Sequence, residues 1–392
     1  NILLHKSIRS SPITKQTLEK KFPQLFVLDE KEHSQSTYIN DEYEDTSMDQ
    51  SLLHWKTNEP NAFTTFSSTL DTAVNYMSKF RADHIVKDAE DIKDALLLPL
   101  DDPSDETPRP WGAALGQSFG GFCMMSYISL VPNPPKICLL TGGIAPMLTS
   151  PFHVYNALWD RVKERNLLYY EMYPSDIRMV HNIVAKLLEN PVMLPSGGRL
   201  TARRFLQVGI QLGGSPSSFS SLHSLLGSAF LDGSDNDNDD EIVFSKAFLK
   251  HMDSIQPFDD HPIYFLLHES IYADGKKFGA TEWAAHRAFE ERTKTPNDFS
   301  YKLTSKMKSD TRPTLMFGEM IFPWMADGDF VEVSGLGMKA LAHSLARKKD
   351  WTPLYDENAM KKALAPGGPC KAAAAVYFDD MYVDFDACMK VA

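Results

Sequence analysis

The feature that most constrains the fold of this chain is a glycine-rich turn around one serine, Gly-Gln-Ser-Phe-Gly-Gly at residues 116–121. The apolar run before it, residues 111–115, is predicted to be a short buried strand. The apolar run after it, residues 122–130, is predicted to be a buried helix that stops at a proline-rich segment. Ser118 is therefore expected on a sharp strand-to-helix turn, which is the position of the nucleophile in a nucleophile elbow.

The residue types at this turn suit that chemistry. A nucleophile elbow forces strained backbone geometry on the serine and leaves little room on either side, so that small residues are needed at Gly116 and Gly120. The turn also directs the backbone N–H of Phe119 and the helix N-terminus toward a developing oxyanion. We therefore predict that Ser118 is a catalytic nucleophile and that Phe119 contributes to the oxyanion hole.

Composition limits the possible partners. The 392 residues, 43% of them hydrophobic, suffice for one large domain with an insertion or for two domains. The formal net charge of −12 and the lack of a basic run with interleaved aromatics argue against nucleic acid as a partner. No apolar run is long enough to span a membrane, so we expect no membrane insertion.

Four cysteines give no sign of a metal site or of a disulfide framework. Cys123, Cys138, Cys370 and Cys388 lack metal-ligand spacing, and they are too few to cross-link a chain of this size. We expect buried free thiols, no metal, no cofactor and a cytoplasmic location.

The pattern along the first part of the chain predicts an α/β core. A strand is predicted within residues 21–29, and a second at residues 137–140. Between them, residues 80–96 are predicted to form an amphipathic helix that places Ile85, Ala89, Ile92 and Leu96 on the sheet. The order strand, helix, strand around residue 118 predicts a parallel sheet.

A mostly helical region follows, with helices predicted at residues 180–188, 201–212 and 282–294. We interpret residues 148–344 as a helical cap inserted into a core made of residues 1–147 and 345–392. Within the cap, residues 232–241 carry six carboxylates without the order of a calcium-binding loop, which favours an acidic surface loop.

The chain returns to the core at its C-terminal end. Residues 335–351 are predicted to form a helix and residues 372–378 a late strand, with Asp379 and Asp380 directly after it. Functional groups gather at the carboxyl edge of open α/β sheets, so these two carboxylates are candidate site residues.

Six blocks in this order resemble the proline iminopeptidases (prolyl aminopeptidases), especially their longer fungal and plant forms. They are Gly-Gln-Ser-Phe-Gly-Gly-Phe-Cys at 116–123, Leu-Thr-Gly-Gly-Ile-Ala-Pro at 140–146, Leu-Pro-Ser-Gly-Gly-Arg-Leu-Thr-Ala-Arg-Arg-Phe-Leu at 194–206, His-Glu-Ser-Ile-Tyr at 268–272, Gly-Glu-Met-Ile-Phe-Pro-Trp-Met at 318–325 and Asp-Asp-Met-Tyr-Val-Asp-Phe at 379–385. The resemblance implies an α/β-hydrolase fold with a helical cap and removal of N-terminal proline from peptides by a Ser, Asp and His triad.

The resemblance also implies roles for individual residues. Asp380 matches the triad acid, with Asp379 and Asp384 as nearby alternatives. Glu269 resembles the family's amine-binding glutamate, and Glu319 is a second candidate for the same role, because a substrate with a free N-terminus brings a cation that carboxylates can hold.

Three other polar residues in the matching blocks are expected to be structural. His268 adjoins Glu269, but neighbouring residues of a helix point in different directions, so we expect it to pack against aromatic rings. Arg203 and Arg204 are expected to form salt bridges or helix-end contacts.

Two features of the family are not found in the sequence. The Gly-rich loop that supplies a second oxyanion N–H has no counterpart near residues 1–7, and the loop at residues 29–34 also departs from the family pattern. Every histidine precedes Asp380, the last being His343, whereas this fold places the catalytic histidine after the acid. Truncation of a longer protein is the favoured explanation; a decayed homologue and recruitment of His33 are the alternatives.

The sequence therefore predicts a serine aminopeptidase of the proline iminopeptidase type that acts on peptides with a free N-terminus. The alternatives are an esterase or amidase of the same fold and a catalytically impaired homologue that serves as a structural or interaction subunit. Membership of an oligomer or complex is compatible with each of these hypotheses.

Overall fold

The computed structural model describes ten stretches of the chain. They are residues 2–3, 15–21, 60–97, 109–215, 217–231, 243–255, 258, 261–293, 299–302 and 312–392. The strand predicted within residues 21–29, His33, the loop at residues 29–34 and the acidic segment 232–241 lie outside these stretches, apart from Lys21.

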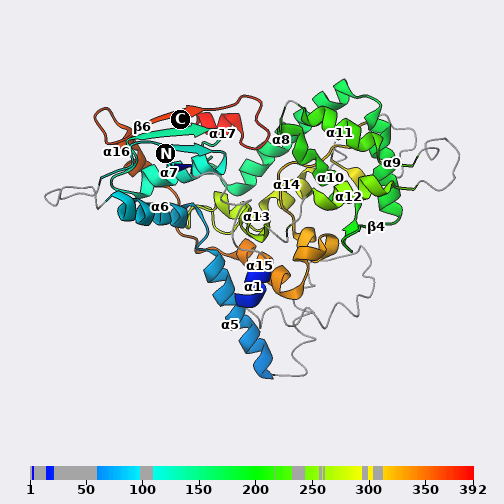
Figure 1. Cartoon of the computed structure of the whole chain (residues 1–392), viewed down its shortest axis with the longest axis horizontal. Coiled ribbons are helices and arrows are strands. Elements are labelled where there is room, and N and C mark those ends of the chain that lie inside the picture. The colour runs from blue at the N-terminus through cyan, green and yellow to red at the C-terminus, as the bar shows by residue number, and fades with distance from the viewer. Residues whose placement is uncertain are drawn as a thin grey trace.

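A parallel sheet forms one end of the molecule (Figure 1). Its strands follow the order β1 (Ile2–Leu3), β2 (Ala114–Gln117), β3 (Ile137–Thr141) and β6 (Lys371–Ala375), and each neighbouring pair is parallel. The predicted strand at residues 111–115 begins later than expected, because register with β3 starts only where Ala114 pairs with Cys138. The late strand ends earlier than expected, at Ala375, since the following segment leaves the sheet.

The faces of this sheet differ in what covers them. Helix α7 (Phe119–Leu130) packs on β2 and β3, and α6 (Ala82–Leu97) and α16 (Glu357–Leu364) pack beside α7. Cys138 and Leu140 of β3 are buried, whereas the alternate residues Ile137 and Leu139 are more than 40% exposed. Alternation along the strand thus separates a face buried under α7 from an open face.

The predicted buried face of α6 is confirmed at Ala89 and was wrong at Ile92 and Leu96. Its buried residues are Ala82, Val86, Ala89 and Lys93, whereas Ile92 and Leu96 are exposed. Lys93 can be buried because its ammonium group lies 2.5 Å from the carboxylate of Glu90. Glu90 also accepts a hydrogen bond from Tyr127 of α7, so a polar contact rather than the isoleucine and leucine stripe fixes which side of α6 faces the sheet layer.

Helices dominate between β3 and β6. Their bounds are α8 (Pro151–Met172), α9 (Asp176–Glu189), α10 (Ala202–Leu206), η2 (Gln207–Gly213), α11 (Ser218–Gly227), α12 (Lys246–Ser254), α13 (Pro262–Leu267), η3 (Glu269–Tyr272), α14 (Ala284–Thr293), η5 (Met325–Asp329), η6 (Val331–Val333) and α15 (Leu336–Arg347). A short antiparallel pair, β4 (Val192–Met193) and β5 (Arg199–Leu200), precedes α10. Helix α17 (Phe385–Met389) follows β6, and α1 (Lys15–Lys21) and α5 (Pro60–Met77) lie between β1 and α6 along the chain.

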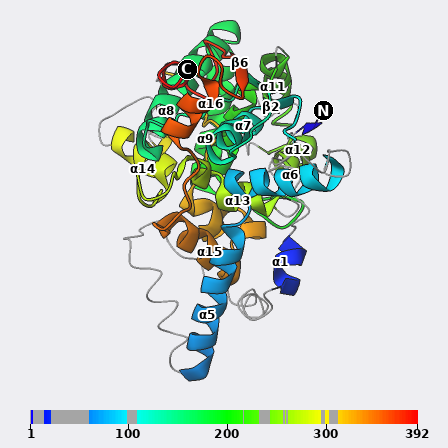
Figure 2. The same ribbon diagram turned by 90° about the vertical axis from the view of Figure 1, so that its left-hand side faces the viewer.

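Figures 1 and 2 show how these elements are arranged. Helices α9 to α12 form a group at the end of the molecule opposite the sheet, and α8 runs between the two ends. Helix α5 packs along α15 and extends away from the rest.

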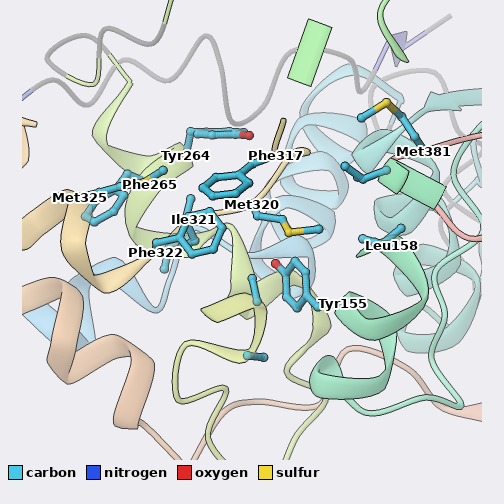
Figure 3. Packing of buried hydrophobic residues seen from close by; sticks show 14 of the residues in the cluster. Tyr155, Leu158, Tyr264, Phe265, Phe317, Met320, Ile321, Phe322, Met325 and Met381 are labelled. Atoms are coloured by element: carbon cyan, nitrogen blue, oxygen red, sulfur yellow. The ribbon is translucent and has the colours of Figure 1, made fainter. Parts of the chain in front are cut away.

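The contact between α8 and the later helices is built from aromatic side chains. Trp159 of α8 is fully buried, and its indole N–H donates to the carbonyl of Ala285 at 3.2 Å. Its ring meets those of Phe299 and Phe317 at centroid distances of 4.6 and 5.6 Å. Figure 3 shows this apolar cluster continuing through Tyr155, Phe322 and Met381. A dense apolar core therefore packs the later helices and segments of this region against α8.

Several expectations can be compared with this architecture. A parallel sheet with helices confirms the α/β class. The four cysteines are free and buried, as expected. Among the described helices, none combines the length and apolarity that a membrane span requires.

Candidate active site

Ser118 lies on the predicted strand-to-helix turn. It connects β2 to α7 with φ 53° and ψ −126°, and its side chain is exposed. A positive φ is costly for a residue with a Cβ atom and is held only when the surroundings enforce it. Here the Ser118 N–H donates to the carbonyl of Thr141, the last residue of β3, at 2.9 Å, and its own carbonyl accepts from Gly121 N at 2.8 Å.

Three glycines leave the space that this turn occupies. A Cβ atom on Gly116 would lie 2.2 Å from the carbonyl oxygen of Gly120, and one on Gly121 would lie 2.3 Å from that of Gly143. A Cβ atom on Gly143 would lie 2.1 Å from the carbonyl oxygen of Ser118. These contacts with rigid backbone explain why glycine is needed near the end of β2, in the first turn of α7 and just after β3.

The backbone of the turn provides an environment suited to an oxyanion. Phe119 is the first residue of α7, and Ser118 makes no side-chain capping bond to that helix. First-turn N–H groups of a helix have no acceptor within the helix, and the helix dipole favours negative charge there. The Phe119 N–H therefore lies where the sequence predicted an oxyanion donor.

Asp380 lies at the same edge of the sheet. Its Oδ1 accepts hydrogen bonds from the N–H groups of Tyr382 at 2.7 Å and Val383 at 3.1 Å. Its Oδ2 lies 3.7 Å from the position that a Cβ atom on Gly142 would take, directly after the residue that accepts the Ser118 N–H. Burial raises the pKa of Asp380, the two backbone N–H groups oppose that shift, and the negative charge of Glu319 adds to it.

The two alternative acids are engaged elsewhere. Asp379 is 70% exposed and pairs with Arg165 at 3.1 Å. Asp384 pairs with Arg161 at 3.1 Å and caps α17 through the N–H of Ala387. Asp380 is thus the one of the three carboxylates with an oxygen facing the end of β3, and no described histidine is hydrogen-bonded to it or to Ser118.

Glu269 is buried and bound to a helix N-terminus. Its two carboxylate oxygens accept from the N–H groups of Ala284 and Ala285, each at 2.9 Å, at the start of α14. Burial raises the pKa of Glu269 to about 7, against the lowering effect of these backbone donors and of Thr281. Each oxygen of a carboxylate has a second lone pair, so these bonds leave acceptor capacity for a cation.

The turn before α14 is strained. Glu282 and Trp283 have φ values of 50° and 54°, in the left-handed region that residues other than glycine rarely adopt. The Glu282 N–H donates to the carbonyl of Ala346 at 2.8 Å, and the Trp283 indole donates to His343 at 3.2 Å. Strain of this kind concentrates at functional sites, and here it aims the N-terminus of α14 at Glu269.

Glu319 is half-buried on the segment before η5. Its Oε1 accepts from the hydroxyl of Tyr264 at 3.1 Å. His268 donates from Nε2 to the Glu319 carbonyl at 3.3 Å, and its ring packs on Tyr264 with centroids 4.9 Å apart. His268 therefore packs against an aromatic ring, as the sequence predicted.

The two arginines make structural contacts, as predicted. Arg203 binds Asp329 through both Nε and a terminal nitrogen, at 2.7 and 2.8 Å. Arg204, 3% exposed, donates to the Asp329 carbonyl at 2.8 Å and lies 3.7 Å from Glu332.

A row of aromatic rings connects the elbow to the carboxylates. Phe119 contacts Phe122 at a centroid distance of 6.2 Å, Phe122 contacts Tyr272 at 6.0 Å, and Tyr272 contacts Tyr155 at 5.6 Å. Burial raises the pKa of Tyr272, and the charges of Glu319, Asp380 and Glu269 raise it further. All three carboxylates therefore lie within electrostatic reach of one ring in this row.

Tyr155 is the residue of this site that sequence reasoning missed. It is fully buried in the cluster of Figure 3, and its hydroxyl has no hydrogen-bond partner among the described residues. Burial raises its pKa well above the usual range, and Glu269 is the largest charge contribution in the same direction. Buried hydroxyls are rarely left unpaired, so this one marks a polar position inside an apolar cluster. No local sequence signal identifies it; Tyr272, by contrast, ends the block at residues 268–272.

The described residues contain no group of three or more histidine, cysteine, aspartate or glutamate side chains arranged to hold a metal ion.

A sharp strand-to-helix turn around a serine at the carboxyl edge of a parallel sheet is typical of the α/β-hydrolases. No family model matches this chain, but curated relatives do. It is 37% identical over 312 residues to "Proline iminopeptidase" of Aeromonas sobria, and 33% identical over 317 residues to "Proline iminopeptidase aneH" of Aspergillus aculeatus. The matches cover 80% and 79% of this chain, which is therefore similar over most of its length to proline iminopeptidases. It spans 64% and 62% of the lengths of these relatives.

Proposed function

We propose that the protein is a serine aminopeptidase that removes the N-terminal residue, preferably proline, from peptides. The observation that carries this proposal is the aromatic row from Phe119 to Tyr155, which joins the elbow to the buried carboxylates. A nucleophile and an ammonium site close together select the first peptide bond of a chain, because the charged end of the substrate fixes which carbonyl meets the serine.

In the proposed mechanism, Ser118 attacks the scissile carbonyl and the Phe119 N–H stabilises the oxyanion. Oδ2 of Asp380, which accepts no hydrogen bond from a described residue, would orient the imidazole of a catalytic histidine, and that imidazole would take the Ser118 proton and return it to the leaving amine. None of the described histidines is hydrogen-bonded to Ser118 or Asp380, so this role is assigned to no residue of the described part of the chain. The resulting acyl-enzyme is hydrolysed by water through the same groups in reverse order. No cofactor is required.

Glu269 and Glu319 would hold the ammonium group at the substrate N-terminus. In an N-terminal proline this is the secondary ammonium of the pyrrolidine ring, which carries two N–H donors. An ammonium group held by carboxylates in a pocket with little water is bound more strongly than the same pair at the surface. Tyr155 and Tyr272 would form the apolar wall against the pyrrolidine ring, with the Tyr155 hydroxyl close to the charged nitrogen. This arrangement favours a compact, apolar first residue.

The helical region would act as the cap of this site. We propose residues 148–344 as the cap and residues 1–147 and 345–392 as parts of the core, since Glu269, Glu319 and Tyr155 lie on the former and Ser118 and Asp380 on the latter. A cap that carries the recognition groups can exclude longer N-terminal extensions while leaving the nucleophile on the sheet.

The test uses the full-length natural protein. The wild type should release proline from a prolyl arylamide and be labelled at Ser118 by a fluorophosphonate probe. Ser118→Ala should lose both, with a rate reduction of at least about 10⁴-fold. Ser129→Ala is the matched control, because its hydroxyl only donates to the Met125 carbonyl within α7 and should leave activity unchanged.

The outcomes separate the alternatives. Labelling of Ser118 with hydrolysis of simple esters but no release of proline would indicate an esterase or amidase. Neither labelling nor release, with stable co-purification in a complex, would indicate a structural or interaction subunit.

A further inference from the structure

The segment that carries Asp380 is held on both sides by the helical region. Before Asp380, Asp379 pairs with Arg165 of α8 at 3.1 Å. After it, Asp384 pairs with Arg161, one turn earlier on α8, also at 3.1 Å. The segment from residue 379 to residue 384, here called the acid segment, therefore runs along one side of α8.

The middle of the acid segment docks on η2. Met381 is 1% exposed, and the hydroxyl of Tyr382 donates to the Ile210 carbonyl at 2.7 Å. A Cβ atom on Gly213 would lie 2.5 Å from Cγ of Met381 and 2.7 Å from Cζ of Tyr382. The absence of a side chain at position 213 is thus what allows this close approach.

Asp380 takes its orientation from the same segment. Its Oδ1 is held by the N–H groups of Tyr382 and Val383, so its carboxylate plane depends on where those two peptide groups lie. Their position is fixed by the Tyr382 contact on one side and by Asp384 on the other. A shift of the segment would move Oδ2, the oxygen that faces the end of β3.

The ion pairs that Arg165 and Arg161 make with the acid segment differ in strength. In the pair of Arg165 with Asp379, the Asp379 side chain is 70% exposed, and exposed ion pairs contribute little to stability. The pair of Arg161 with Asp384 is shielded, with side chains 18% and 8% exposed, and Arg161 also reaches Asp386 at 3.2 Å. Removing one partner of a shielded pair leaves the other charge without compensation, so Arg161 is the contact that holds the segment.

We propose that Arg161 is a positioning residue for the triad acid: through Asp384 it holds the acid segment so that Asp380 Oδ2 faces the end of β3. The proposal rests on the proposed role of Asp380. Because Tyr155 and Arg161 lie on the same helix, α8 couples the pocket for the first residue of the substrate to the orientation of the catalytic acid.

The experiment measures kinetics and amide hydrogen exchange on the full-length natural protein. Arg161→Met should lower kcat for a prolyl arylamide about tenfold, since small misplacements of catalytic groups are costly, while KM changes less than twofold. The amides of Tyr382 and Val383 should exchange at least several-fold faster. Arg161→Lys should keep kcat and the amide exchange rates of Tyr382 and Val383 close to those of the wild type, because an ammonium group can still reach Asp384.

Two further variants keep the test decisive. Asp384→Asn retains an N-cap acceptor for α17 but removes the charge, so it should reproduce the loss of kcat even if Arg161→Met does not fold. Arg292→Met is the matched control. Arg292 lies on α14 and pairs with Asp160 of α8 at 2.7 Å, away from the acid segment. Its loss should change neither kcat nor the amide hydrogen exchange of the acid segment.

The possible failures are distinguishable. If Asp380→Asn abolishes activity while Arg161→Met and Asp384→Asn leave kcat and exchange unchanged, the positioning role is overturned. The same holds if Arg292→Met produces equal effects. If Asp380→Asn keeps the wild-type kcat, Asp380 is not the triad acid and the proposed function loses that residue, whatever the Arg161 variants do.

Discussion

The turn around Ser118 and the surroundings of Glu269 are built in opposite ways. Ser118 is exposed, and its position is set by backbone: a positive φ, glycines without room for a Cβ atom and a bond to β3. Glu269 is buried, and its carboxylate is held by the N–H groups of Ala284 and Ala285, 15 and 16 residues further along the chain at the start of another helix.

The difference separates reactivity from recognition. Local backbone can present a nucleophile, because the turn and the helix start supply both the geometry and the oxyanion donor. Binding of an ammonium group needs carboxylates kept away from water, which only packing of several helices can provide. Variants at the two places should therefore fail in different ways.

The largest effect is expected at the elbow. Gly143→Ala would place a Cβ atom 2.1 Å from the Ser118 carbonyl oxygen, and the backbone cannot yield without moving the nucleophile. We expect kcat/KM to fall about 1,000-fold and the free energy of unfolding to fall by about 3 kcal/mol. Steady-state kinetics and urea denaturation measure the two quantities. Gly112→Ala, where no atom lies within 4 Å, should change stability by less than about 0.5 kcal/mol.

The second largest effect on kcat/KM is expected at Glu269. Glu269→Gln should lower kcat/KM for a prolyl arylamide about 100-fold, which corresponds to about 2.7 kcal/mol of lost charge recognition. Hydrolysis of an uncharged ester should be unaffected, since the elbow is intact. Glu290→Gln, an exposed position on α14, is the control. Equal losses on both substrates would show that Glu269 supports the fold rather than the substrate ammonium.

A pH effect on stability is expected from the same carboxyl. Burial raises the pKa of Glu269 in the folded protein from its usual value of 4.5 to about 7. The folded protein thus holds the proton more tightly, so the contribution of this group is present below pH 4.5 and is lost as pH rises through 7. The free energy of unfolding of the wild type, relative to Glu269→Gln, should fall on the order of 3 kcal/mol between pH 4.5 and pH 8. Parallel pH profiles of the two proteins in urea denaturation would contradict the assignment.

The smallest effect concerns two buried tyrosines of α8. Tyr155→Phe removes a hydroxyl without a partner, so stability should not fall, while kcat/KM should drop about threefold to tenfold if the hydroxyl contacts the substrate. Tyr170→Phe removes a hydroxyl that donates to the Thr314 carbonyl at 2.7 Å. That variant should lose about 1 kcal/mol of stability and keep its activity. A drop in activity for both would point to a general loosening of α8.

The parts of the fold that the sequence predicted well are local. The strand before α8 and the helix after Ser118 follow from apolar runs bounded by glycine and proline, and both are present within a few residues of their predicted bounds. The face of α6 was predicted wrongly at Ile92 and Leu96, because Lys93 is buried through Glu90 and a partner on another helix. A hydrophobic pattern cannot report such a partner.

The sequence by itself determined the strand-to-helix turn at Ser118, the α/β class and the resemblance to the proline iminopeptidases, because these rest on contiguous residues whose backbone requirements and order are visible along the chain. Only the tertiary structure showed that Glu269 is bound to the start of α14, that the ring of Tyr155 contacts that of Tyr272, and that Arg161 pairs with Asp384. The last two contacts join residues more than one hundred positions apart, and packing alone brings them together.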